Sequence, residues 1–161
     1  RLTRSFPMCP RPERREGRPA PQVVAREVVE EITLPVPAPS IAPGFALAGK
    51  PAYLETGASL RPPTIERQTE LGVISVTARG TYTVDWGDGT PVERHAVEGG
   101  PWPDGPIRHV YTHARTYDVV VSIEWTADWV VAGVPGTLEG LRTSATLAGF
   151  EVRQLQAVRD R

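Results

Sequence analysis

The stretch YTVDWGDGT at residues 82–90 combines the end of one predicted strand with a tight turn. Gly87 and Gly89 accept the positive φ that such a turn requires, and the Asp88 carboxylate can accept hydrogen bonds from amides of its own loop. We therefore predict that this stretch forms the corner between two strands of a β-protein.

Strands are predicted on both sides of this corner by a two-residue period of apolar side chains. The period runs from residue 74 to 84, and apolar residues again fill one face from Tyr117 to Val131. A straight strand of the second length would reach on the order of 50 Å. We therefore expect it to bend, bulge or switch sheets.

The rest of the carboxyl-terminal half is predicted to return as further strands. Gly133, Pro135 and Gly136 indicate a turn. Residues 137–147 are then expected to pair with the preceding strand, and residues 150–158 to form the last strand.

The amino-terminal part has a different composition, since 12 of the 17 prolines fall within residues 1–63. Residues 1–22 hold six arginines and the single cysteine, Cys9, and are predicted to be a disordered basic arm. Residues 23–48 are predicted to form a short helix, over 23–34, followed by an extended Pro-rich strap. A first edge strand is expected over 46–55, and the globular domain over 49–161.

Charge and hydropathy exclude some classes of function. The formal net charge is -1, from 18 basic and 19 acidic residues, so we expect no binding to nucleic acid. No apolar run approaches the roughly 18 residues that a transmembrane helix needs. One cysteine permits no internal disulfide.

Three motifs in sequence order resemble those of polycystic-kidney-disease (PKD) domains: the turn at 85–90, HVYT at 109–112 and TYDVVV at 116–121. The residues that carry the resemblance are Asp85, Trp86, Gly87, Asp88, Gly89, Thr90, His109, Tyr111 and Tyr117. The chain departs from the family pattern at Val84, Trp86, Val110 and Arg115. The resemblance implies an all-β, immunoglobulin-like antiparallel β-sandwich.

A wider likeness includes the segments 34–37, 49–54, 125–129 and 152–158. Through these segments the chain is similar to a group of uncharacterised exported actinobacterial proteins that contain a PKD-like domain. This likeness implies a location outside the cell or in the cell envelope.

Residues able to support catalysis or bind a metal are few. No serine lies in a Gly-x-Ser-x-Gly elbow, and no Gly-rich phosphate loop precedes a helix. His109 and His113 are spaced for a strand and turn rather than for a zinc site. Asp85, Asp88 and Asp104 leave calcium as a weaker alternative. We expect no enzyme activity, no cofactor and no metal.

Aromatic residues are the remaining signal for binding. Trp102 lies in the loop GGPWPDG at 99–105, where prolines stiffen the backbone, and is expected either to plug one end of the domain or to contact a partner. Trp125 and Trp129 share an apolar strand face and are expected in the core. The Tyr111 hydroxyl is expected to tie a corner.

These observations favour a non-catalytic, exported or envelope-attached module for structure or protein interaction. Its partner is expected to be another envelope protein or a second copy of the chain. The alternative is a domain that binds carbohydrate or cell-wall polymer through Trp102, and a weaker one is a calcium-dependent module.

Overall fold

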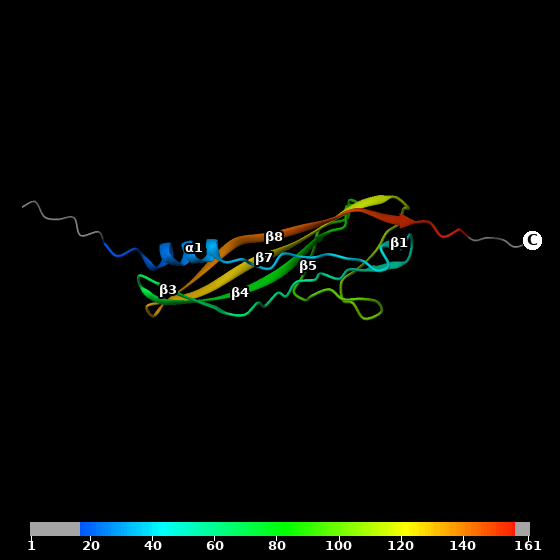
Figure 1. The fold of residues 1–161 in the computed structure, drawn as a ribbon. Coiled ribbons are helices and arrows are strands. Elements are labelled where there is room, and N and C mark those ends of the chain that lie inside the picture. Colours follow the sequence, from blue (N-terminus) through cyan, green and yellow to red (C-terminus); the bar gives the residue numbers. More distant parts are fainter. Residues whose placement is uncertain (1–16, 157–161) are drawn as a thin grey trace, which may run out of the picture.

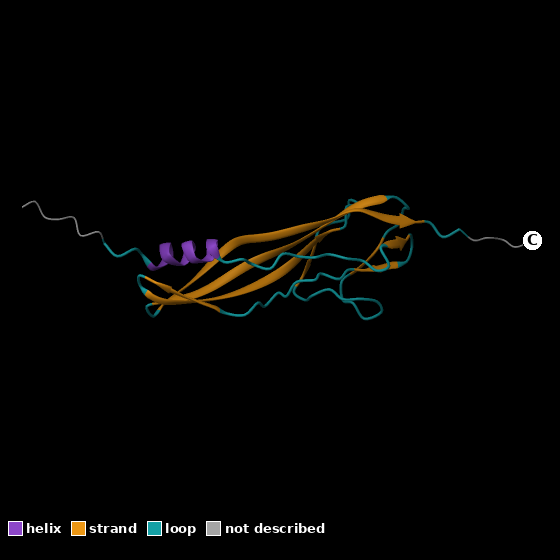
Figure 2. Ribbon diagram, viewed as in Figure 1, coloured by secondary structure: helices purple, strands orange, loops and turns teal. Residues whose placement is uncertain are grey.

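The structure is a computed structural model that describes residues 17–156. Most of the predicted basic arm, including Cys9, and the end of the predicted last strand lie outside the described residues. The described chain is mostly β, as predicted (Figure 2). Its elements in chain order are α1 (Pro21–Glu31), β1 (Phe45–Leu47), β2 (Pro51–Tyr53), β3 (Ile65–Thr69), β4 (Gly72–Asp85), β5 (Glu93–His95), β6 (Arg108–Val110), β7 (Thr116–Val131) and β8 (Val134–Arg153).

The strands form one large sheet and one small one. The large sheet has the order β1-β8-β7-β4-β3, with β5 also paired to β4, and the small sheet pairs β2 with β6. The predicted antiparallel arrangement is wrong at one place, because β1 runs parallel to β8. The parallel pair joins strands that are about 100 residues apart in sequence, a relationship that no local pattern encodes.

Three long strands, β4, β7 and β8, give the molecule its elongated, twisted shape (Figure 1). The register between β7 and β8 shifts between Tyr117 and Val119 and between Trp125 and Ala127, and at both places the extra residue lies on β8 rather than on β7. Strand β7 does not switch sheets. Bulges bend a strand and increase the local twist, so the two bulges of β8 allow the long β7–β8 pair to stay in one curved sheet.

The predictions for the end of the chain need correction. The two strands expected over 137–147 and 150–158 are one strand, β8, of 20 residues. The turn before it consists of Ala132 and Gly133, whose φ values are 50° and 75°. Two successive residues with positive φ suit a two-residue hairpin, so Pro135 and Gly136 belong to the strand instead.

Helix α1 covers one end of the large sheet. It begins two residues before the predicted start, at Pro21, and ends at Glu31 rather than residue 34. Proline suits the first turn of a helix because an N–H at that position would have no partner within the helix, so proline loses no hydrogen bond there. The buried face of α1, Ala25, Val28 and Val29, packs on β4 and β7 residues of the sheet: Ile74, Val76, Ala127, Trp129 and Val131.

The Pro-rich strap and the following loops cover the other end. After α1 the chain runs extended along the sheet, and the Thr143 hydroxyl donates to the Pro35 carbonyl at 2.7 Å. The single strand predicted over 46–55 is instead two strands, β1 and β2, in different sheets, because the chain turns at Gly49, whose φ is 79°. Both lie over the larger core, which includes the predicted core residue Trp125.

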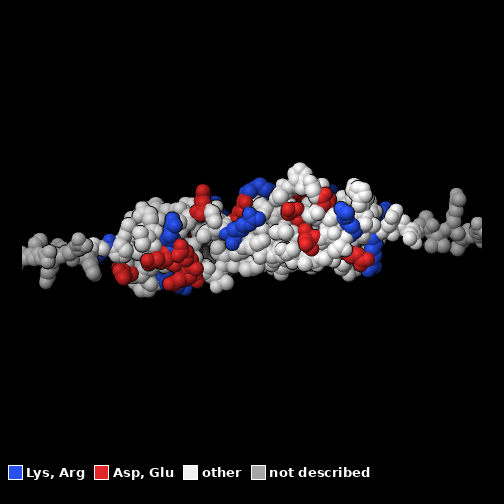
Figure 3. All heavy atoms as spheres, turned by 90° about the horizontal axis from the view of Figure 1, so that it is seen from above, with Lys and Arg blue, Asp and Glu red and all other residues white. Residues whose placement is uncertain are grey.

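The opposite face of the large sheet is polar. Along β4 its side chains include Thr77, Arg79 and Thr83, and Arg79 pairs with Asp128 of β7 at 2.5 Å. On the face seen in Figure 3 both signs of charge are interspersed, with a group of acidic side chains toward the end that carries α1.

Candidate functional site

The turn after β4 is held by its own carboxylates. Asp85 Oδ1 accepts from the Gly87 amide at 2.9 Å, and Asp88 Oδ1 accepts from the Thr90 amide at 3.1 Å and the Thr90 hydroxyl at 2.6 Å. Gly87 has a φ of 76°, and a Cβ there would overlap the Asp118 backbone. Asp88 thus structures the turn, and glycine is required at position 87.

His109 and three aromatic residues fasten this turn to the core. His109 Nε2 lies 2.7 Å from Asp88 Oδ2, and the Trp86 indole stacks on the imidazole with centroids 4.8 Å apart. The buried Tyr111 hydroxyl donates to the Trp86 carbonyl at 3.0 Å, which is the corner contact expected of it. Tyr117 stacks on Tyr111 in turn.

Electrostatics keep Asp88 ionised and Tyr111 neutral near neutral pH. Burial acts to raise the pKa of Asp88, but hydrogen bonds from Thr90 and His109 outweigh it and hold the pKa below its usual value. Burial, together with the nearby negative charges, raises the pKa of Tyr111. In these states the Asp88 carboxylate accepts the hydrogen bonds of the turn and the Tyr111 hydroxyl donates to the Trp86 carbonyl, which stabilises the corner.

The candidate metal ligands do not converge. His95 lies against Glu93 at 2.9 Å, and His113 Nδ1 lies against the Thr112 hydroxyl at 2.8 Å. Within residues 17–156 no three His, Cys, Asp or Glu side chains are placed to hold a metal ion. The calcium alternative therefore finds no support in the geometry of Asp85, Asp88 and Asp104.

Trp102 lies at the rim of a groove. The residue is 74% exposed, which contradicts the alternative that its ring plugs the end of the domain. The loop beneath it is closed by a hydrogen bond from the Gly105 amide to the Pro101 carbonyl at 2.8 Å. Two prolines and this bond restrict the loop, so little conformational entropy remains to be lost on binding.

The groove collects residues from β1, β2, their connecting turn and the Trp102 loop. It has a volume of about 270 Å³ and is lined mostly by apolar and aromatic groups, including Phe45 and Tyr53, together with the charged residue Lys50. The Arg153 guanidinium lies 4.0 Å from the centroid of the Phe45 ring. We call the surface formed by Pro43, Phe45, Lys50, Pro51, Tyr53 and Trp102 the Trp102 groove.

Of the groove residues, only Trp102 stands out in the sequence as a binding residue. Phe45 and Tyr53 fell within or beside a single expected strand, where neighbouring positions gave no reason to bring their rings together. The turn at Gly49 reverses the chain and places both on one surface. The closely spaced aromatic and proline residues of segment 43–53 were the available signal.

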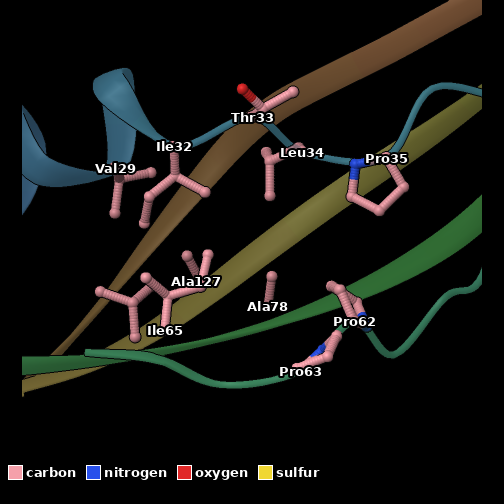
Figure 4. A pocket seen from close by; sticks show the side chains of 11 residues that line it. Val29, Ile32, Thr33, Leu34, Pro35, Pro62, Pro63, Ile65, Ala78 and Ala127 are labelled. Atoms are coloured by element: carbon pink, nitrogen blue, oxygen red, sulfur yellow. The ribbon is translucent and has the colours of Figure 1, made fainter. Parts of the chain in front are cut away.

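A second hollow, between α1 and the sheet, is too small for a ligand. It is lined by the end of α1, the strap, Pro62, Pro63 and sheet residues such as Ala78 and Ala127, and only Thr33 is polar (Figure 4). It has room for about one water molecule, 20 Å³. This hollow is a packing gap between the two cores.

Known proteins give no further guide to this site. No family model matches the chain, and no curated protein and no solved structure is similar to it. The resemblance to PKD domains therefore stays a proposal. Among the described residues, no helix is long and apolar enough to cross a membrane.

Proposed function

We propose that the chain is a non-catalytic, exported module with a PKD-type, immunoglobulin-like fold that contacts another protein of the cell envelope through the Trp102 groove. The observation that carries the proposal is the 74% exposure of Trp102 beside an aromatic groove on a stiffened loop. The other three tryptophans are buried in the cores, which makes Trp102 the exception.

The composition of the groove supports a protein partner. Tryptophan, tyrosine and arginine are the residues that most often dominate the energy of protein interfaces, and Trp102, Tyr53 and Arg153 lie at or beside this groove. Rigid aromatic anchors lose little rotamer entropy on binding. A partner that buries the Trp102 ring removes a large apolar surface from water.

The PKD-type fold is supported by the corner at residues 85–90. Its hydrogen bonds and the Tyr111 contact to Trp86 resemble the tyrosine corner that joins strands in immunoglobulin-like sandwiches. The exported location rests on the sequence resemblance.

A carbohydrate or wall polymer is the second candidate ligand. Flat aromatic faces stack against the C–H faces of sugar rings, and the groove has three aromatic side chains, Phe45, Tyr53 and Trp102. The same residues would serve either ligand, so the experiment must separate the two.

The test uses the full chain as bait on native envelope fractions, with Trp102→Ala and a control, Val92→Ala. Val92 is another exposed apolar residue, 57% exposed, and lies outside the groove. A protein captured by the wild type and the control but not by Trp102→Ala is then purified and titrated. Because Trp102 is the exposed tryptophan, its fluorescence should shift on binding.

Capture of wall polymer with the same dependence on Trp102 would favour the carbohydrate alternative. Capture that is the same for the wild type and Trp102→Ala would refute the groove as the binding surface.

A further inference from the structure

The outer edge of β8 is the longest strand edge in the described structure without a strand partner over most of its length. On one side β8 pairs with β7 from Val134 to Glu151. On the other it pairs with β1 only at Glu151–Arg153. An unpaired edge presents a row of N–H and C=O groups that can accept another strand.

The direction of the backbone groups follows from both ends of β8. Val131 and Val134 flank a two-residue turn and so exchange hydrogen bonds, and at the other end the Val152 amide donates to the Arg115 carbonyl at 2.9 Å. Counting from either end through the bulges, the groups of Arg142, Ser144 and Thr146 point away from β7.

The stretch from Leu141 to Ala148 lacks the usual protection of a free edge. It lies between Gly140 and Gly149, which have positive φ, and it contains no proline and one charge, Arg142. The edges of β3 and β5 are instead short and charged. The strap contacts this stretch through the Thr143 side chain, which leaves the outward backbone groups of β8 unpaired among the described residues.

We propose that this edge pairs with the same edge of a second copy, antiparallel and about a two-fold axis at Ser144. The register is selected by the side chains. With Ser144 opposite its equivalent, Arg142 faces Thr146 of the second copy, and all three outward-directed residues form hydrogen-bonded pairs, roughly six bonds in total.

The same register also matches the apolar residues and avoids facing charges. Leu141 and Leu147 are partly buried at the margin of the larger core, and each lies opposite the other of the second copy. A register shifted by one residue would place side chains on the core face of one copy opposite side chains on the polar face of the other. Strand β1 already pairs with this edge of β8 at Glu151–Arg153, and the second copy would pair with the part of the edge that precedes it. It is separate from the Trp102 groove and does not depend on the proposed function.

The test measures mass by sedimentation over a wide range of concentration, for the full chain and for Thr146→Pro. Proline removes an outward N–H but no bond to β7, and Pro135 already occupies an equivalent position on β8. We expect a species of twice 17.5 kDa for the wild type and a dissociation constant at least about tenfold weaker for the variant.

A cross-linking experiment tests the register without relying on the proline variant. In a Cys9→Ser background, Ser144→Cys places two thiols opposite each other at a Cα separation of about 5.5 Å, within the range of a disulfide. Thr137→Cys is the control, since its two copies would lie on the order of 45 Å apart.

A disulfide dimer for Ser144→Cys but not for Thr137→Cys supports the pairing. A wild type that stays monomeric, a dimer that Thr146→Pro does not weaken although the variant is folded, or equal cross-linking at both positions would each overturn it.

Discussion

Replacing Asp88 with asparagine should weaken the corner at residues 85–90 in a pH-dependent manner. The side chain is 12% exposed and its two oxygens accept from the Thr90 amide, the Thr90 hydroxyl and His109. Asparagine keeps one acceptor for Thr90 but loses the charge and the oxygen that faces His109.

The magnitude follows from the lost contact. A hydrogen bond to a charged group contributes about 1.5–3 kcal/mol, and the remaining partner, His109, is 10% exposed and would be poorly solvated. We therefore expect the free energy of unfolding to fall by about 2 kcal/mol at neutral pH.

The sign of the pH dependence follows from the lowered pKa of Asp88. A carboxyl group with a lower pKa in the folded state stabilises the protein above its unfolded pKa of 3.8, and this stabilisation is lost as the pH falls through the folded pKa. The difference between wild type and Asp88→Asn should therefore shrink in acid.

Urea unfolding at neutral pH and at about pH 3, followed by circular dichroism, measures this difference. Asp104→Asn is the control, and we expect it to change stability by less than about 0.5 kcal/mol. An Asp88→Asn protein as stable as the wild type at neutral pH, or an equal loss at both pH values, would refute the role given to this carboxylate.

Three further substitutions and one control test the packing and the exposed position of Trp102. Gly136→Ala should lower the melting temperature and destabilise by about 1–3 kcal/mol or more, because its Cβ would overlap the Trp129 ring. Val28→Ala should destabilise by about 2 kcal/mol in urea unfolding, since it opens a gap between α1 and the sheet, whereas Val23→Ala, on the exposed side, should have little effect. Trp102→Ala should change the unfolding free energy by less than about 0.5 kcal/mol, and a larger loss would indicate a structural role.

The sequence was a good guide where one local rule acts over a long run. The apolar alternation of β4 and β7 is uninterrupted, so both strands and the burial of Trp125 and Trp129 were predicted correctly. In β8 the alternation is hidden by two bulges. Each inserts one residue and shifts the inward positions, first between Leu138 and Leu141 and again between Leu147 and Phe150.

The candidate site was predictable only in part for a different reason. Trp102 stood out because prolines flank it. Whether its ring plugs the end of the domain or contacts a partner, however, depended on what lies beneath the ring. Phe45 and Tyr53 join it only because the chain turns at Gly49 and β1 attaches to β8, more than 100 residues away. A long-range pairing of this kind depends on which surfaces remain uncovered after the rest of the chain has folded.

Local sequence patterns suffice to predict strands β4 and β7 and the turn at residues 85–90. These depend on alternation along one segment and on hydrogen bonds between residues two positions apart, such as Asp88 and Thr90. The parallel attachment of β1, the continuity of β8 and the assembly of the Trp102 groove follow instead from long-range contacts. Their partners are distant in sequence, and their contacts form only because burial of both cores brings those segments together.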